Sequence, residues 1–344
     1  MSAGEKVEKL TVLGAGSWGT AIANLLANNG HRVHLWCYEK ETAEEIKKER
    51  TNSVYLPGIT LSNDIIPTTS LEEACSNSKR IISVVPSQFT RSVIEKAKPF
   101  IPNECFFVSA SKGIEKESLC TMSQVIKETL GNEKKYNLVT LGGPTFAIEV
   151  AKKLPTVMVI ASESEEASRQ FQMLFSNHHF RAYTNNDIIG VELGGAIKNV
   201  IAIAAGIVSG LGGGHNTIAA LITRGIAEIS RLGISMGAKL LTFAGLAGIG
   251  DLILTCTGNL SRNRTVGYRI AKGESLSDIL SGMKMVAEGV ETSKSVEGLA
   301  KKQNVEMPIC HEVYLILFHN KKPSDAIKSL MERNLKKEFQ EGIM

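Results

Sequence analysis

The chain has 344 residues, of which 43% are hydrophobic and 22% are charged, and its formal net charge is +4. This length predicts two domains, and the composition is ordinary for a soluble globular protein. The mild positive charge suits anionic small ligands. No block of Lys and Arg carries interleaved aromatic residues, which excludes a nucleic-acid-binding protein.

Three further features indicate that the chain is not a metal-binding, secreted or membrane-spanning protein. The six cysteines are scattered, with no Cys-x-x-Cys pair and no histidine at metal-ligand spacing, so we expect reduced thiols and no metal site. The polar residues 1–9 are not typical of a signal peptide, which favours the cytoplasm. The uncharged stretch 199–223 is interrupted by a glycine-rich run, so we expect two buried core helices and no membrane-spanning segment.

The first predicted element is a buried strand over residues 10–13, which runs directly into a glycine turn. Gly14, Gly16 and Gly19 have the spacing G-x-G-x-x-G, and an amphipathic helix and a second apolar strand follow. This order is typical of a βαβ unit that binds a dinucleotide, because the glycines allow a tight turn, a close pyrophosphate and helix packing. The helix N-terminus would attract the phosphates. A merely structural glycine turn is the alternative.

The second strand, over residues 33–36, ends near the position that usually meets the adenosine ribose. Tyr38, Glu39 and Lys40 follow it. An acid there favours NAD, whereas a basic neighbour allows the extra phosphate of NADP. Glu39 and Lys40 therefore indicate opposite preferences, and the choice of cofactor stays open. Lys40 could equally be a solvated charge.

Strands and helices continue to alternate along the first half of the chain. Strands are predicted over 80–85, 105–108, 138–141, 156–160 and 180–183, and helices over 41–50 and 165–175. Lys112 follows one strand on a loop of small residues, where its charge could face an anionic ligand or only solvent. A Gly-Gly-Pro-Thr turn after another strand opens a helix, with Pro144 expected at the first helical position.

The alternation of strands and helices stops near residue 187, and the pattern is helical from there on. We therefore expect an α/β domain with a doubly wound sheet over residues 1–187 and an all-helical domain over residues 188–344. The apolar helices are compatible with a homodimer. We expect the active site in a cleft between the domains, beyond the carboxyl ends of the strands.

A long helix of small and apolar residues over 192–208 contains only two strongly polar residues, Lys198 and Asn199. Gly194 and Ala202 lie four residues to either side of Lys198, so this lysine shares a helix face with small residues. In such surroundings a lysine loses hydration, which lowers its pKa and suits it to proton transfer. A lysine that snorkels out of a core helix is the alternative.

Three further groups in the second half could carry chemistry. Asp251 heads an apolar helix where an N-cap carboxylate belongs, and capping alone could explain it. The run Ser261 to Arg264 combines hydroxyl, guanidinium and amide groups into a possible phosphate clamp, with a basic surface loop as the alternative. Glu288 lies in another glycine turn and could accept a hydrogen bond from a ribose or an amide.

Together these motifs resemble the NAD(P)-dependent glycerol-3-phosphate dehydrogenases of bacterial type, essentially from end to end. The resemblance is carried by GAGSWGTA (14–21), VVPS (84–87), SKG (111–113), GGPTFA (142–147), ELGGAIKNVIAI (192–203), TRGIAE (223–228), AGIGDL (247–252) and LSRNR (260–264). It implies a Rossmann-type domain followed by a helical domain similar to that of 6-phosphogluconate dehydrogenase. It also implies that NAD(P)H reduces the phosphorylated triose dihydroxyacetone phosphate to sn-glycerol 3-phosphate for phospholipid synthesis.

The resemblance implies a role for individual residues by position. Lys198 would be the catalytic acid/base, with Asp251 and Lys112 beside it. The dinucleotide would contact Gly14, Gly16, Ser17, Trp18, Gly19, Tyr38, Lys112, Ala147, Arg262, Val286 and Glu288. The substrate would contact Lys112, Gly143, Thr145, Lys198 and Asp251, and its phosphate would lie against Ser261, Arg262 and Asn263. Tyr38 and Glu39 depart from the basic or histidine-containing turn often found there, which weakens any strict NADP preference.

Two other functions remain as alternatives. A related β-hydroxyacid or ketopantoate-type reductase would keep the fold and also use a lysine on a helix of the second domain. The Ser261-Arg262-Asn263-Arg264 run favours a phosphate over a carboxylate, which needs fewer donors. A nicotinamide-binding sensor is the non-catalytic alternative, but a sensor does not need a proton donor such as Lys198.

Overall fold

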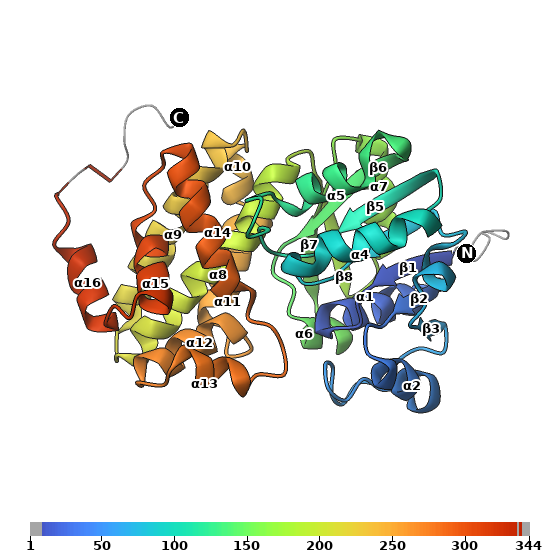
Figure 1. Cartoon of the computed structure of the whole chain (residues 1–344), viewed down its shortest axis with the longest axis horizontal. Helices are drawn as coiled ribbons and strands as arrows, with labels where there is room; N and C mark the ends of the chain where they lie inside the picture. Colours follow the sequence, from blue (N-terminus) through green and yellow to red (C-terminus); the bar gives the residue numbers. More distant parts are fainter. Residues whose placement is uncertain (1–8, 336, 339–344) are drawn as a thin grey trace. The chain divides into compact units, whose positions relative to one another are not determined.

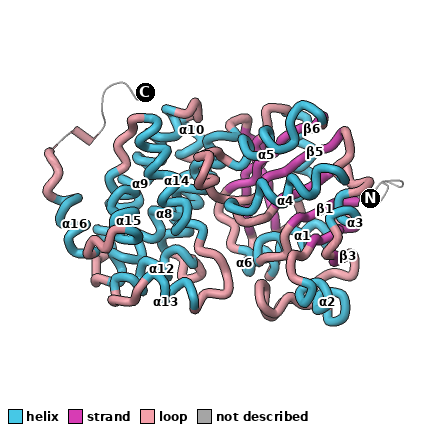
Figure 2. Tube along the Cα trace, in the orientation of Figure 1, coloured by secondary structure: helices cyan, strands magenta, loops and turns pink. Residues whose placement is uncertain are grey.

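The computed structural model describes residues 9–335 and 337–338, and it divides into two compact units. The first unit runs up to Glu115 and continues over Cys120–Glu192, and the second contains Lys116–Leu119 and the chain from Leu193 onwards. The division at 192 falls inside a helix, α8 (Ile188–Gly210), whose first turn belongs to the first unit. All described strands lie in the first unit, as the magenta segments of Figure 2 show.

The first unit is built on one eight-stranded sheet in the order β3-β2-β1-β4-β5-β6-β7-β8 (Figure 1). Its strands are β1 (Lys9–Leu13), β2 (Arg32–Trp36), β3 (Ile65–Thr68), β4 (Arg80–Ser83), β5 (Glu104–Ser109), β6 (Lys135–Gly142), β7 (Thr156–Ala161) and β8 (Phe180–Asn185). Neighbouring strands are parallel, except that β6 and β7 pair antiparallel. All of the predicted strands are confirmed, as is the doubly wound α/β fold.

The helices of this unit connect the strands and cover both faces of the sheet. They are α1 (Ser17–Asn28), α2 (Lys40–Glu49), α3 (Leu71–Cys75), α4 (Thr90–Ala97), α5 (Met122–Leu130), α6 (Ala147–Ala151) and α7 (Glu165–Phe175), with short 3-10 turns η1 (Ser87–Phe89), η2 (Lys98–Phe100) and η3 (Gly131–Glu133). One face buries Val12, Ile82, Val108 and Val139 in the main core. Such parallel strands are apolar on both sides because both faces are covered.

The second unit consists of helices. They are α9 (His215–Ser235), α10 (Leu240–Phe243), a π-helical turn η4 (Leu246–Gly250), α11 (Asp251–Thr257), α12 (Arg262–Ala271), α13 (Leu276–Ser281), α14 (Glu288–Gln303), α15 (Pro308–Phe318) and α16 (Pro323–Met331), together with most of α8. The two predicted core helices are therefore present as α8 and α9. The expectation of full burial is wrong for α9, whose buried residues begin at Leu221, because its first turns face outward.

Glycines bring α8 and α12 together backbone to backbone. A Cβ atom at Gly206 would lie 2.0 Å from the carbonyl oxygen of Arg264, and one at Gly267 would lie 1.9 Å from that of Ile203. Any side chain at either position would force the helices apart. The start of α12, which carries Arg262 and Asn263, is thereby held against the helix that carries Lys198.

Two described stretches, Ile188–Gly210 and Leu240–Thr257, are long and apolar enough to cross a membrane by length and composition alone. In the first, 94% of the apolar window is buried inside the structure, as in the core helix of a globular unit. The second is divided among α10, η4 and α11, and 44% of its window is buried.

Candidate active site

The glycine turn between β1 and α1 has the geometry that a phosphate cradle requires. Gly14 has φ of +110°, and a Cβ atom at Gly19 would lie 1.8 Å from the carbonyl oxygen of Gly14. Gly16 is the N-cap residue of α1 and brings no capping side chain, and a Cβ at Gly16 would meet no described atom within 4 Å. The open space and the helix N-terminus fit the pyrophosphate of a dinucleotide.

The residues after β2 occupy the predicted ribose position. Tyr38 is 79% exposed and stands edge-on to Trp36, with ring centroids 6.3 Å apart. The Glu39 carboxylate accepts a hydrogen bond of 2.9 Å from the Tyr55 hydroxyl, which orients it at the end of the strand. Lys40 has a side chain that is 80% exposed and pairs with Glu44 at 3.8 Å, as a solvated lysine does.

Three predicted substrate residues of the first unit meet at one backbone carbonyl. The Nζ of Lys112 donates to the carbonyl oxygen of Gly143 at 3.0 Å, and the Thr145 hydroxyl donates to the same oxygen at 3.3 Å. Gly143 has φ of +111°, and a Cβ there would lie 3.2 Å from the Cα of Met158. Lys112 and Gly143 are 31 residues apart in the sequence, and the pairing of β5 with β6 brings them together.

The expected helix start at Pro144 is wrong. Helix α6 begins at Ala147, with Phe146 as its N-cap residue in extended conformation. The positive φ of Gly143 turns the chain away from β6 before any helix can form, so Pro144 and Thr145 lie in the intervening bend. Ala147, one of the predicted dinucleotide contacts, is the first helical residue and packs partly against the core.

In the second unit the structure brings Lys198 and Asp251 into direct contact. The two residues are 6% and 1% exposed, and the Nζ of Lys198 donates to Asp251 Oδ1 at 2.7 Å. The same Nζ donates to the Thr255 hydroxyl at 2.8 Å, and this hydroxyl donates to the Asp251 carbonyl oxygen at 2.6 Å. Lys198 is therefore a buried cation with a fixed direction, and it does not snorkel to solvent.

Asp251 does not act as an N-cap, which corrects the sequence prediction. The π-helical turn η4 runs into α11 without a break, and Gly250 already has helical φ and ψ of −62° and −50°. The Asp251 carboxylate is thereby free of a capping role and accepts from Lys198 instead. A Cβ at Gly194 would lie 2.4 Å from the carbonyl oxygen of Ala247, so the small-residue face of α8 admits the backbone of η4 at that position.

Two side chains of the predicted phosphate clamp, Ser261 and Asn263, make hydrogen bonds within the protein. Ser261 is the N-cap residue of α12, and its hydroxyl accepts from the Arg264 N–H at 3.3 Å. Asn263 donates to the side chain of Asn199 at 3.0 Å and accepts from the Gly289 N–H at 2.9 Å. Asn263 thus joins α12 to α8 and α14.

Arg262 is the cation of this clamp, and its Nη1 donates to the carbonyl oxygen of Val286 at 2.8 Å. Burial lowers the pKa of Arg262 from its ordinary value, and the charge of Glu288 opposes that effect. A guanidinium keeps its charge in proteins and has five donors, so one bond to a carbonyl leaves others for a ligand. Val286, Glu288 and Arg262, all predicted cofactor residues, thus lie together, whereas half-buried Arg264 donates to the side chain of Asn259.

Sequence reasoning missed Thr255 and gave no role to Asn199. Thr255 lies four residues after Asp251 on α11, a spacing that places both side chains on one helix face. Asn199 follows Lys198 directly and holds Asn263. In the described part of the chain, no group of three or more His, Cys, Asp or Glu side chains could hold a metal ion.

The doubly wound sheet with a cradle for a dinucleotide, followed by a helical unit with a buried lysine, defines a two-domain nicotinamide-dependent oxidoreductase. Two family models match the chain: the N-terminus of NAD-dependent glycerol-3-phosphate dehydrogenase matches residues 9–168, and its C-terminus matches residues 187–328. The chain belongs to this glycerol-3-phosphate dehydrogenase family.

Individual relatives agree with the family models. The chain is 54% identical to glycerol-3-phosphate dehydrogenase (NAD(P)+) of Citrifermentans bemidjiense over 331 residues, which cover 96% of this chain and 99% of the relative. A crystal structure of glycerol-3-phosphate dehydrogenase from Coxiella burnetii has a TM-score of 0.91 and 37% identity, and covers 95% of this chain and 99% of that one. A ketopantoate reductase from Ralstonia eutropha, at 14% identity and a TM-score of 0.58, shares the fold alone.

Proposed function

We propose that the chain reduces dihydroxyacetone phosphate to sn-glycerol 3-phosphate with NAD(P)H and that Lys198 is its general acid. The observation that carries this mechanism is the buried ammonium of Lys198, held by Asp251 and Thr255 at 2.7 and 2.8 Å. The family membership and the names of the relatives support the substrate and the cofactor.

The dinucleotide would be held by the glycine turn and the N-terminus of α1, where a Cβ at Gly16 would fill the cradle. When bound, this cofactor supplies the hydride that reduces the ketone carbon of the substrate. We assign further dinucleotide contacts to Ser17, Trp18, Tyr38, Lys112, Ala147, Arg262, Val286 and Glu288, as their positions in the family imply.

Lys198 would complete the reduction by giving a proton to the ketone oxygen as negative charge develops on it. The ammonium both stabilises the growing charge and forms the new O–H bond. Asp251 and Thr255 would aim the ammonium, since both accept hydrogen bonds from it. The neutral amine that remains would be the base for the reverse reaction.

The substrate phosphate would bind to the Arg262 guanidinium, beside Ser261 and Asn263. Binding energy from this remote group would orient the ketone without contacting the reacting atoms. Lys112, Gly143 and Thr145 would hold the rest of the substrate, because they form one polar cluster at the carboxyl ends of β5 and β6.

The product is the phosphorylated backbone of glycerophospholipids, so we propose that the enzyme supplies lipid synthesis in the cytoplasm. We also propose a homodimer. Sedimentation velocity at micromolar concentration tests the dimer, and a single species with the mass of one chain would overturn it.

Lys198→Met tests the mechanism, since methionine keeps most of the unbranched side chain and removes the ammonium group with its proton. We expect kcat to fall by about 10²- to 10⁴-fold, the usual contribution of general acid–base catalysis. The dissociation constant of NADH, measured by its fluorescence, should change little. A variant with an unchanged kcat would overturn the assignment of Lys198.

A further inference from the structure

A second buried carboxyl group, Glu192, lies on the same helix as Lys198 and has no role in the chemistry proposed above. Glu192 is 5% exposed and lies at the last position of the first unit. Its Oε1 accepts from the Ser123 N–H at 2.8 Å and from the Thr140 hydroxyl at 3.3 Å. Its Oε2 accepts from the Ser123 hydroxyl at 2.6 Å.

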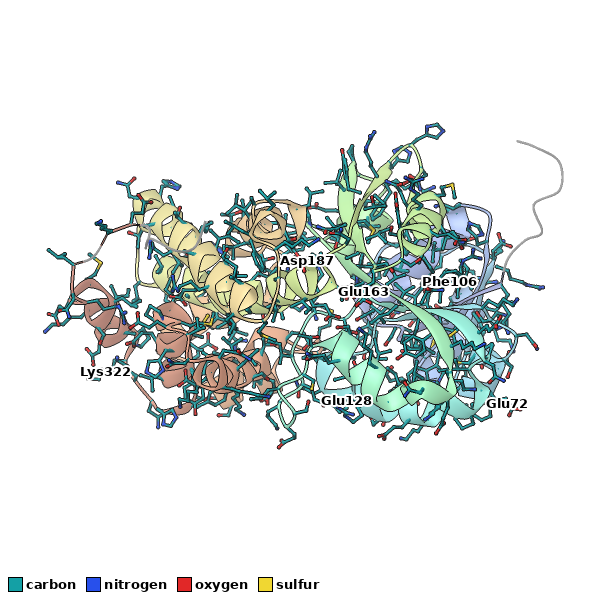
Figure 3. All side chains as sticks on the ribbon, turned by 90° about the horizontal axis from the view of Figure 1, so that it is seen from above. Glu72, Phe106, Glu128, Glu163, Asp187 and Lys322 are labelled. Atoms are coloured by element: carbon teal, nitrogen blue, oxygen red, sulfur yellow. The ribbon has the colours of Figure 1, made fainter. Side chains whose placement is uncertain are left out.

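These contacts tie the base of α8 to two elements of the first unit. Ser123 is in the first turn of α5, whose free N–H groups and partial positive charge favour a carboxylate. Thr140 lies near the carboxyl end of β6. The start of α8 is also capped, because the Asp187 carboxylate accepts from the Gly190 N–H at 2.9 Å; Asp187 is labelled in Figure 3.

The sheet extends the polar surroundings of Glu192 beyond Thr140. Ser83 and Ser109 are paired in register on β4 and β5, and Ser109 is paired with Thr140 on β6, so the three hydroxyls form one row on one face. Ser83 and Ser109 are each 1% exposed, and their hydroxyls have no hydrogen-bond partner among the described residues. This row of hydroxyls therefore extends the polar surroundings of Glu192 across three neighbouring strands.

Helix α8 carries both this anchor and the proposed acid. The helix is continuous from Ile188 to Gly210, so Lys198 lies six residues beyond Glu192, about 9 Å along the axis at 1.5 Å per residue. An α-helix transmits a shift of its base to the residues further along. A displacement of about 1 Å at a reacting group can cost about 10²-fold in rate.

We propose that Glu192 is a positioning residue, which fixes the base of α8 to α5 and β6 so that Lys198 stands in the correct place for proton transfer. This inference rests on the proposed role of Lys198. Burial raises the pKa of Glu192 and the donors from Ser123 and Thr140 oppose that rise, so the contacts compensate a real cost of burying the group.

Glu192→Leu and Glu192→Gln test the proposal in the full-length enzyme. Leucine removes every acceptor, so we expect kcat to fall about tenfold or more while the dissociation constant of NADH stays unchanged. The solvent deuterium isotope effect on kcat should rise, because a misplaced ammonium makes proton transfer slower. Glutamine keeps an acceptor for Ser123 and should restore most of kcat.

A matched control is Glu228→Leu, since Glu228 is also a buried helix carboxyl that accepts from N–H groups at the start of another helix. It accepts from Ile309 at 2.7 Å and Cys310 at 3.2 Å, and it is 2% exposed. We expect this variant to lose thermal stability with kcat per folded molecule unchanged. If Glu192→Leu behaves in the same way, Glu192 is structural only and the proposal is overturned.

Thr140→Val covers the case in which Glu192→Leu fails to fold, because it removes one donor to Glu192 and leaves both bonds from Ser123. We expect a smaller fall in kcat with the same rise in the solvent isotope effect, and an unchanged isotope effect would overturn the proposal. Failure of the proposed function has a different signature, since Lys198→Met would then retain its kcat.

Discussion

At the scale of the residue, the chemistry depends on how two cations are held, Lys198 buried in the core of the second unit and Arg262 at its surface. Lys198 has a carboxylate and a hydroxyl within 2.8 Å, and Arg262 has a backbone carbonyl at the same distance. Burying an ion is costly unless it is paired and hydrogen-bonded. The pairing of Lys198 with Asp251 keeps an ammonium charged inside the protein, and the carbonyl partner of Arg262 leaves the positive charge of the guanidinium uncompensated at that contact.

Arg262→Ala tests whether the Arg262 guanidinium binds the phosphate of the substrate. A charged hydrogen bond contributes about 1.5–3 kcal/mol, so we expect the KM for dihydroxyacetone phosphate to rise by about 10- to 150-fold. Turnover of phosphate-free dihydroxyacetone should change far less. The control is Arg264→Ala, since the Arg264 guanidinium donates to the exposed side chain of Asn259 at 3.2 Å. An equal loss with both substrates would contradict the phosphate clamp.

At the scale of the element, close backbone contacts and buried hydrogen bonds hold the helices of the second unit together. Gly206 and Gly267 let α8 and α12 touch backbone to backbone. Glu228 of α9 holds the first N–H groups of α15. Each contact joins segments that are far apart in the sequence. Disturbing either contact should change the free energy of unfolding.

Gly267→Ala should destabilise the protein, because the added methyl would lie 1.9 Å from the Ile203 carbonyl oxygen. Overpacking of this kind costs about 1–3 kcal/mol or more, which urea unfolding measures. Gly282→Ala is the matched control: Gly282 has φ of −82°, and its nearest Cβ contact would be an ordinary 3.6 Å. Equal stability of the two variants would show that α8 and α12 do not need this contact.

Stability should depend on pH through Glu228. Burial raises the pKa of Glu228 to about 7 from 4.5, and the N–H groups of Ile309 and Cys310 and the charge of Arg231 oppose it. Between pH 4.5 and 7 the unfolded chain therefore binds fewer protons than the folded protein. The free energy of unfolding falls as pH rises through this window, by roughly 3 kcal/mol for a shift of this size.

Glu228→Gln removes this titration, so the variant should gain stability relative to the wild type as the pH rises from 4.5 to 7. Urea unfolding at a series of pH values measures the difference. Glu163→Gln is the control, since the side chain of Glu163 is 76% exposed, and it should keep the wild-type slope. A constant difference between wild type and Glu228→Gln across this range would show that Glu228 does not titrate there.

At the scale of the whole molecule, the chain forms two compact units and crosses between them more than once. Besides the crossing in α8, the segment Lys116–Leu119 leaves the first unit and joins the second. There a Cβ at Gly298 would lie 3.1 Å from the side chain of Leu119, so this glycine of α14 accommodates the inserted leucine. The glycine cradle lies in one unit and the proposed acid in the other, so the reaction depends on both.

Gly16→Val tests the contribution of the cradle to the whole protein. A Cβ at Gly16 would meet no described atom within 4 Å, so we expect the fold and the melting temperature of the free protein to be preserved. Ligand at 100 times its dissociation constant stabilises a protein by about 2.7 kcal/mol. The NADH-induced rise in melting temperature should therefore be present in the wild type and lost in the variant. A variant that keeps the rise would place the pyrophosphate elsewhere.

The sequence by itself determined several features that depend on local spacing. The glycine turn at 14–19, the alternation of strands and helices up to 187 and the small-residue helix around Lys198 are each specified by neighbours in the chain. Periodicity and turn chemistry act over a few residues, so these features could be predicted. The resemblance to a family added Gly143, Ala147 and Val286 as site residues.

Only the tertiary structure decided which side chains meet. The sequence predicts Asp251 as a helix cap. In the structure the π-helical turn continues into α11 without a break, and the Asp251 carboxylate accepts a hydrogen bond from Lys198. Other side chains bond residues that are 52 to 69 positions away in the sequence. Thr255 bonds Lys198, Asn199 bonds Asn263, and Glu192 bonds Ser123 and Thr140. Such contacts depend on how helices and strands pack, and no local pattern in the sequence encodes that packing.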